Sequence, residues 1–165
     1  MQKIFILLIV ASLVALNGCG TSLRVFSDID DSGQFEQYST YSFMDFSDGN
    51  KETISGMELE RIRVAFAREL EQRGLKFMEQ NGEVSVRIIV YHRQAMDGYY
   101  GYPGQYNYME RALAVDMYDN ATLKHIWHCA AVGELVYDPV ERAENLYEVV
   151  AEIFERYPVQ PIAAL

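Results

Sequence analysis

The sequence has few of the residues that stabilise small exported domains or mark common active sites. Its 165 residues include two cysteines, four prolines, one tryptophan and three histidines. Fourteen basic residues stand against 24 acidic ones, which gives a formal net charge of −10. A surface this acidic argues against nucleic-acid binding and against electrostatic adhesion to an anionic membrane surface.

The common catalytic and cofactor motifs are also missing. There is no G-x-S-x-G, no H-E-x-x-H and no phosphate-binding glycine loop. The D-x-D-x-S-G stretch that starts at Asp28 imitates half of a calcium loop, but Ser39 occupies the position that needs a bidentate glutamate. A turn with Asx-type hydrogen bonds is therefore the preferred interpretation.

The histidines do not form a metal-binding motif either. His125 and His128 are three positions apart on a predicted strand, so they point to opposite faces unless a bulge intervenes. His92 could approach one of them across the sheet. We expect no metal site, no cofactor and no catalytic residues, and we interpret the glutamates of the last helix as a solvated surface.

No apolar run is long enough for a stable transmembrane helix. The longest, Ile4 to Leu16, would span about 20 Å as a helix, against about 30 Å of bilayer hydrocarbon. Lys3 precedes it and Asn17-Gly18-Cys19 follows, the layout of a signal peptide that resembles a bacterial lipobox, although alanine or serine is more usual at position 17. We expect a lipoprotein signal peptide over residues 1–18, lipid attachment at Cys19 and a lipidated tether over 19–22. The alternative is an ordinary cleaved signal with a coincidental cysteine.

Residues 23–165 are predicted to form one α/β domain. Removing 18 of the 165 residues leaves 147, enough for one hydrophobic core, and the loss of Lys3 changes the formal charge from −10 to −11. Lipidation of Cys19 leaves Cys129 without an intramolecular partner, so we expect no disulfide.

Hydrophobic periodicity predicts six strands and two helices. Strands are expected over 23–29, 38–46, 75–78, 84–90, 113–117 and 125–136. A capping box at Ser55 and Glu58 opens the first helix, which Gly74 ends, while Asp138 caps the last helix and Pro158 ends it. The order β-β-α-β-β-β-β-α predicts an α+β fold, a two-layer α/β sandwich whose mostly antiparallel sheet carries both helices on one face.

Several short motifs, in this order and spacing, resemble a bacterial lipoprotein family called "domain of unknown function 4136". They include the S-D-I-D at 27–30, the YSTYSF at 38–43, the break at Gly74, the strand at 84–90, the LAVDM at 113–117, the DNATLKHIW at 119–127 and the R-Y-P at 156–158. Members often carry glycine just before Ala112 and at the position of Cys129, so the strand ends there are expected to differ. The resemblance implies an envelope lipoprotein with an α/β fold and brings no established catalytic residues.

One stretch is unusually rich in tyrosine and glycine. Residues 98–108 lie between two predicted neighbouring strands, and tyrosines offer large amphipathic contact areas at low entropic cost. The stretch is either a contact surface for a protein or glycan or a long connecting loop. Its candidate binding residues are Tyr99, Tyr100, Tyr102, Tyr106 and Tyr108.

These observations predict a lipid-anchored envelope protein that acts as a non-catalytic binding or assembly module. Its membrane contact would be the lipid on Cys19, and its partner an envelope protein or a glycan. Gly20 stands where an inner-membrane retention signal typically has aspartate, which favours the outer membrane. The alternatives are an envelope hydrolase whose site is built from scattered residues and a purely structural envelope component.

Overall fold

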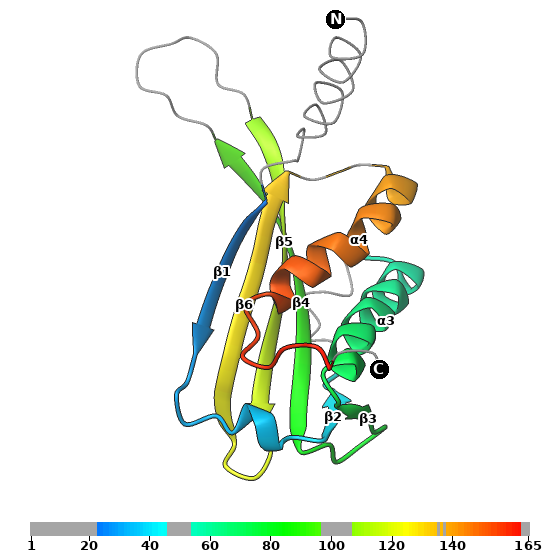
Figure 1. Ribbon diagram of the computed structural model, residues 1–165. Coiled ribbons are helices and arrows are strands. Elements are labelled where there is room, and N and C mark those ends of the chain that lie inside the picture. Colours follow the sequence, from blue (N-terminus) through cyan, green and yellow to red (C-terminus); the bar gives the residue numbers. More distant parts are fainter. Residues whose placement is uncertain (1–22, 46–53, 97–106, 135, 137, 163–165) are drawn as a thin grey trace, which may run out of the picture.

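The strands of the described residues form a single mixed sheet in the order β1-β6-β5-β4-β2-β3 (Figure 1). The computed structural model describes residues 23–45, 54–96, 107–134, 136 and 138–162, with the backbone alone at 92–96, 107–110 and 134. The strands are β1 (Arg24–Ile29), β2 (Thr40–Phe43), β3 (Lys76–Phe77), β4 (Val84–Met96), β5 (Asn107–Asp119) and β6 (Lys124–Glu134). The helices are the 3₁₀ turn η1 (Phe35–Gln37), α3 (Gly56–Gln72) and α4 (Pro139–Phe154).

The α+β prediction and its element order are confirmed. The pairs β1–β6, β6–β5 and β5–β4 are antiparallel, and β2 lies parallel to both β4 and β3. Figure 1 shows α3 and α4 packed on one side of the sheet, which makes two layers. We call the side away from these helices the open face.

Both long helices begin where local sequence predicts. The backbone N–H of Glu58 donates to the Ser55 hydroxyl, and the carboxylate of Asp138 accepts from two N–H groups of the first turn of α4. Gly74, with φ +89°, follows the C-terminal residues of α3 in a conformation that favours glycine. None of the helices in the described part of the chain could span a lipid bilayer.

The core lies between the helices and the inner face of the sheet. Alternate residues of β4 point inward, and Trp127 of β6 is 1% exposed among aromatic side chains of α4 and the residues after it. Cys129 is a buried free thiol, and burial raises its pKa to about 11, so it stays protonated and unreactive at neutral pH.

The predicted strand ends need some correction. The strand expected over 38–46 begins at Thr40, because the Glu83 carboxylate accepts hydrogen bonds from the backbone N–H groups of Ser39 and Thr40 and fixes that end. The strand expected to begin near Ala112 begins at Asn107, since β5 continues its pairing with β4 to the ends of both strands.

Candidate functional site

Four charged or ionisable residues form a cross-strand row on the open face. Residues paired directly across neighbouring strands share a face of the sheet. Asp116 of β5 pairs with Arg87 of β4 on one side and with His128 of β6 on the other, and His128 pairs in turn with Asp28 of β1. The row therefore runs through four adjacent strands.

A β-bulge brings His125 to the same face. The pairing of β5 with β6 shifts between Met117, which lies opposite Trp127, and Tyr118, which lies opposite His125. Ile126 is the extra residue, and Ile126 and Trp127 are 2% and 1% exposed. Because two consecutive residues are taken into the core, His125 and His128 both lie on the open face. The expectation that they point to opposite faces holds for a regular strand and excepts a bulge, and that exception applies here.

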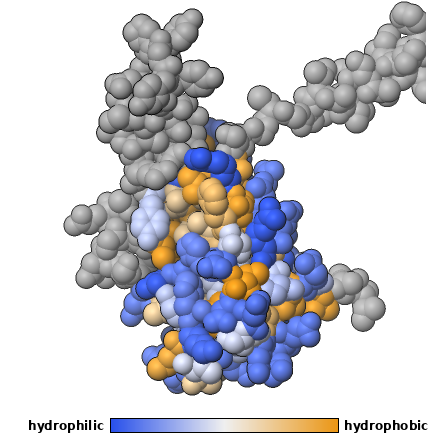
Figure 2. All heavy atoms as spheres, turned by 90° about the vertical axis from the view of Figure 1, so that its left-hand side faces the viewer, coloured by the Kyte–Doolittle hydropathy of each residue, from blue (hydrophilic) through white to orange (hydrophobic). Residues whose placement is uncertain are grey.

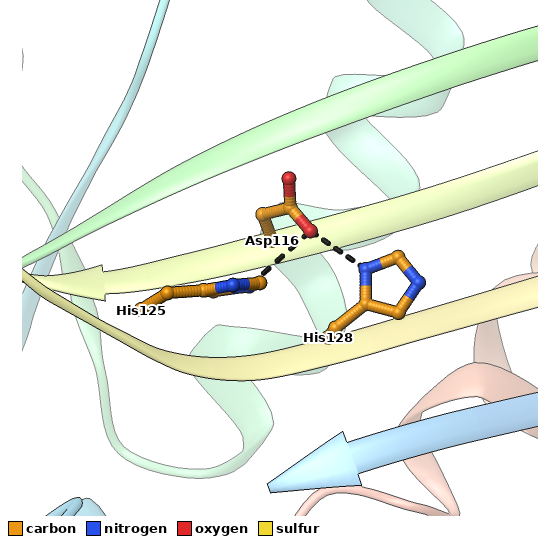
Figure 3. Close-up of side chains that lie close together, drawn as sticks. All are labelled: Asp116, His125 and His128. Carbon is orange, nitrogen blue, oxygen red and sulfur yellow. Dashed lines mark hydrogen bonds and ion pairs between the residues drawn. The ribbon is translucent and has the colours of Figure 1, made fainter. Parts of the chain in front are cut away.

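The two imidazoles converge on one carboxylate oxygen (Figure 3). Oδ1 of Asp116 lies 2.7 Å from Nδ1 of His128 and 3.3 Å from Nε2 of His125. The ring of His125 stacks on the ring of Tyr118 at a centroid distance of 4.8 Å, and its Nε2 is also 3.0 Å from the carbonyl oxygen of Trp127. We call Asp116, His125 and His128 the Asp-His cluster.

The second carboxylate oxygen of Asp116 is held by a different set of groups. Arg87 donates to Oδ2 from Nη2 at 2.7 Å and from Nε at 3.1 Å, and the hydroxyl of Tyr118 contacts both Arg87 and Oδ2. Burial raises the pKa of Asp116, but the hydrogen bonds from His128 and Arg87 and the nearby charges outweigh it and hold that pKa below its ordinary value. The carboxylate is therefore ionised and fixed in orientation.

This arrangement has the ligand atoms of a cation site, and the hydroxyl that it holds is the phenol of Tyr118. Within the described residues, neither imidazole ring has a serine, threonine or cysteine side chain in hydrogen-bond contact, and the hydroxyl of Ser27 donates to the backbone carbonyl of His128 and not to its ring. Two imidazoles and a carboxylate on a partly exposed surface are ligands for a metal ion. These three side chains offer ligand atoms within 4.8 Å of one another.

A second cluster of charges ties the helices to the sheet. Oε1 of Glu58, on α3, lies 2.7 Å from Nη2 of Arg111 on β5 and 3.2 Å from Nε of Arg142 on α4. Burial raises the pKa of Glu58, but the two arginines outweigh it and hold the pKa low. Since one carboxylate joins three elements, we assign this cluster to packing.

Most of the residues predicted to bind lipid or a partner lie outside the described part of the chain. Cys19 and the tyrosines at 99, 100, 102 and 106 lie outside the described residues. Tyr108 belongs to strand β5 and not to a loop, because β4 and β5 pair as far as Met96 and Asn107. His92 pairs with Arg111 in the backbone register, five positions along β4 from Arg87.

The calcium-like stretch is a turn, as predicted. The backbone N–H of Ser32 donates to Oδ1 of Asp30 at 2.8 Å, the hydrogen bond of an Asx turn, and this bond is the main reason that the pKa of Asp30 is lowered. Asp30 therefore shapes the connection between β1 and η1.

Sequence reasoning missed Asp116, because the alternation of apolar and polar residues along 113–117 assigns it to the solvent-facing side of the strand. The signal that could have revealed the cluster is the H-I-W-H stretch at 125–128. Two consecutive large apolar residues interrupt the alternation of β6 between two histidines, which is the pattern that a bulge produces.

Solved structures are similar to this chain at low sequence identity, and those with a TM-score above 0.5 share its fold. A PDZ domain protein from Parabacteroides distasonis matches 93% of the chain at 13% identity with a TM-score of 0.57, and the chain spans 40% of that protein's length. A PelC dodecamer from Paraburkholderia phytofirmans aligns with 85% of this chain at 10% identity with a TM-score of 0.52. The alignment covers 99% of the PelC chain. A minor lipoprotein from Acinetobacter baumannii aligns with 72% of this chain at 11% identity with a TM-score of 0.42. The alignment covers 91% of the lipoprotein chain.

Comparison with curated proteins gives no match. The model of one protein family, described as "Domain of unknown function (DUF4136)", matches residues 25–159, from the second residue of β1 to beyond the end of α4. The match covers nearly the whole described domain, so the chain belongs to the DUF4136 family.

Proposed function

We propose that this protein is a lipid-anchored protein of the bacterial cell envelope that binds an envelope protein through the open face of its sheet and carries out no catalysis. The observation that supports this most directly is that both long helices lie on the same side of the sheet (Figure 1). The open face thus presents side chains of four strands over a broad surface.

An apolar row crosses this face beside the charged row. The backbone register aligns Phe26 of β1, Ala130 of β6, Ala114 of β5 and Ile89 of β4, and of these Ala114 is buried beneath its neighbours at 2% exposure. Phe26 is 56% exposed, although a phenylalanine ring favours burial. Figure 2, which views the molecule from the side of β1, shows hydrophobic surface bordered by hydrophilic residues. An apolar strip with a polar border is the usual anatomy of a protein interface.

The proposed location rests on the start of the chain. The apolar run that ends in Asn17-Gly18-Cys19 supports export and lipidation, and Gly20 supports the outer membrane. The negative net charge leaves the acyl chains as the source of membrane affinity. A Cys19→Ala variant should therefore leave the membrane fraction while keeping the melting temperature of the domain. A variant that still pellets quantitatively with membranes after a high-salt wash would contradict the anchor.

Photo-crosslinking in intact cells tests the binding face. A benzoylphenylalanine is placed at Phe26 or Tyr91, both 56% exposed and both on the open face by register, and at Tyr147 of α4, which is 44% exposed, as the matched control. We expect discrete adducts with the same envelope protein from the first two positions and none from the third. Equal adducts at all three positions, or none at any, would contradict the proposal.

The same experiment separates partner binding from self-assembly. The PelC structure is a dodecamer, and its similarity to this chain concerns the fold alone. If crosslinking from the open face gives an adduct of twice the chain mass, the partner is a second copy of this chain and not an envelope protein of another kind. The tyrosines at 99, 100, 102 and 106 are a second candidate contact. If they take part in binding the partner, changing all four to serine should remove the adducts without lowering the melting temperature.

A further inference from the structure

We infer that the Asp-His cluster is a binding site for a divalent cation of borderline softness, such as Zn²⁺, Ni²⁺ or Cu²⁺. Two imidazole nitrogens and one carboxylate oxygen are the ligand set that these ions prefer, and three protein ligands leave a coordination position for water. The inference does not depend on the proposed partner, because it follows from side chains that the fold itself brings together.

The distances in the cluster fit such an ion after both imidazoles shift, because the three ligand atoms are now spread over as much as 4.8 Å. Two bonds of about 2.1 Å at a tetrahedral angle put the ligand atoms about 3.4 Å apart. Nε2 of His125 is 3.3 Å from Oδ1 of Asp116, which already matches that separation. Nδ1 of His128 is 2.7 Å from the same oxygen and must retreat by about 0.7 Å to admit the ion.

The histidine side chains have the freedom to make this adjustment. Their exposed fractions are 43% for His125 and 40% for His128, whereas that of Asp116 is 7%. A fixed carboxylate with two movable imidazoles gives an entry path from solvent. On ligation, His125 gives up the hydrogen bond of Nε2 to the carbonyl of Trp127.

The groups around the ligands orient the carboxylate and balance its charge. Arg87 and Tyr118 occupy Oδ2 of Asp116, so Oδ1 is directed at the two histidines. Metal-binding carboxylates are commonly held in this way by hydrogen bonds from an outer shell. Asp28, next to His128 in the row, adds a second carboxylate to the row, which carries one positive charge on Arg87.

Calorimetric titration with ZnCl₂ tests the site in the full chain, purified in detergent and treated with a chelator that is then removed. We expect one Zn²⁺ per chain with micromolar affinity, and an affinity at least about tenfold weaker in His125→Ala and in His128→Ala. His92→Ala is the matched control, because it removes the third histidine of the same sheet, five positions from the row along β4. Its affinity for zinc should equal that of the wild type.

Two further measurements keep the test decisive if a variant folds poorly. Co²⁺ bound to the wild type should show the visible absorption bands of a four- or five-coordinate site, and Zn²⁺ should abolish them. Zn²⁺ should also protect His125 and His128, but not His92, from diethyl pyrocarbonate, as mapped by mass spectrometry. The inference is overturned if the wild type binds no zinc up to about 1 mM, if the affinity is unchanged by loss of both His125 and His128, or if zinc protects neither.

Discussion

Replacing Trp127 with alanine should be among the most destabilising single changes in the domain. Its side chain is 1% exposed, with its ring centroid 4.9 Å from that of Tyr157 and 5.5 Å from that of Phe154. The indole N–H donates to the hydroxyl of Ser27 on β1 at 3.1 Å. Trp127 thus joins the edge strand, the sheet and the residues at the end of α4.

The size of the effect follows from burial. Truncation of a fully buried tryptophan to alanine typically lowers the free energy of unfolding by about 3–5 kcal/mol, from lost apolar transfer and from the cavity left behind. The hydrogen bond to Ser27 contributes about 1 kcal/mol of this. For a domain of this size, the loss corresponds to a fall of roughly 10–20 °C in melting temperature.

Urea unfolding followed by circular dichroism measures the change. Trp127→Phe keeps an aromatic ring against Tyr157 and Phe154 and should lose about half as much stability, while Tyr147→Ala on the outside of α4 should change it by about 0.5 kcal/mol. Trp127 is the sole tryptophan, so its fluorescence reports this site alone. A native emission maximum typical of water-exposed indole, or an alanine variant within about 1 kcal/mol of wild type, would refute the reasoning.

Three other changes test separate features of the structure. Gly82→Ala would place a Cβ against the backbone carbonyl carbon of Tyr41, so it should lower the unfolding free energy by about 1–3 kcal/mol. An unchanged urea midpoint would count against this close approach. Leu123 is 81% exposed with φ +59°, so Leu123→Gly should raise stability by a few tenths to about 1 kcal/mol, whereas a lower urea midpoint would contradict the strain. The lowered pKa of Asp116 contributes stability that is present above the ordinary carboxyl pKa of 3.8 and is lost as pH falls through the folded value. Asp116→Asn should therefore flatten the loss of melting temperature below about pH 4. Parallel plots of melting temperature against pH for the variant and the wild type would argue against it.

Local sequence was sufficient for the parts of the fold that depend on neighbouring residues. The helix starts at Ser55 and Asp138 are set by side-chain hydrogen bonds to the first turn, and the end of α3 is set by Gly74, so a few residues determine each boundary. The alternation of β4 depends only on which face is buried. The element order was predictable for the same reason.

The Asp-His cluster depends on strand pairing, which local patterns do not determine. Asp116 and His128 meet because β5 and β6 pair in one register, and His125 joins them through the bulge at Ile126. Arg87, which holds the other oxygen of Asp116, comes from β4, 29 positions before Asp116 in the chain. The parallel placement of β2 beside β4 likewise requires α3 to cross between β2 and β3, which strand propensity cannot indicate.

The pairing of β1 with β6 also has a consequence for the order of folding. Arg24 lies opposite Val132, so the first strand to emerge during synthesis waits for more than a hundred further residues before its partner exists. The β4–β5 and β5–β6 pairs are antiparallel neighbours in sequence and close smaller loops, so they are expected to form sooner. Until β1 docks, β6 presents an unpaired edge to other chains. Refolding at high concentration should therefore yield strand-exchanged dimers, in which β1 of each copy completes the sheet of the other.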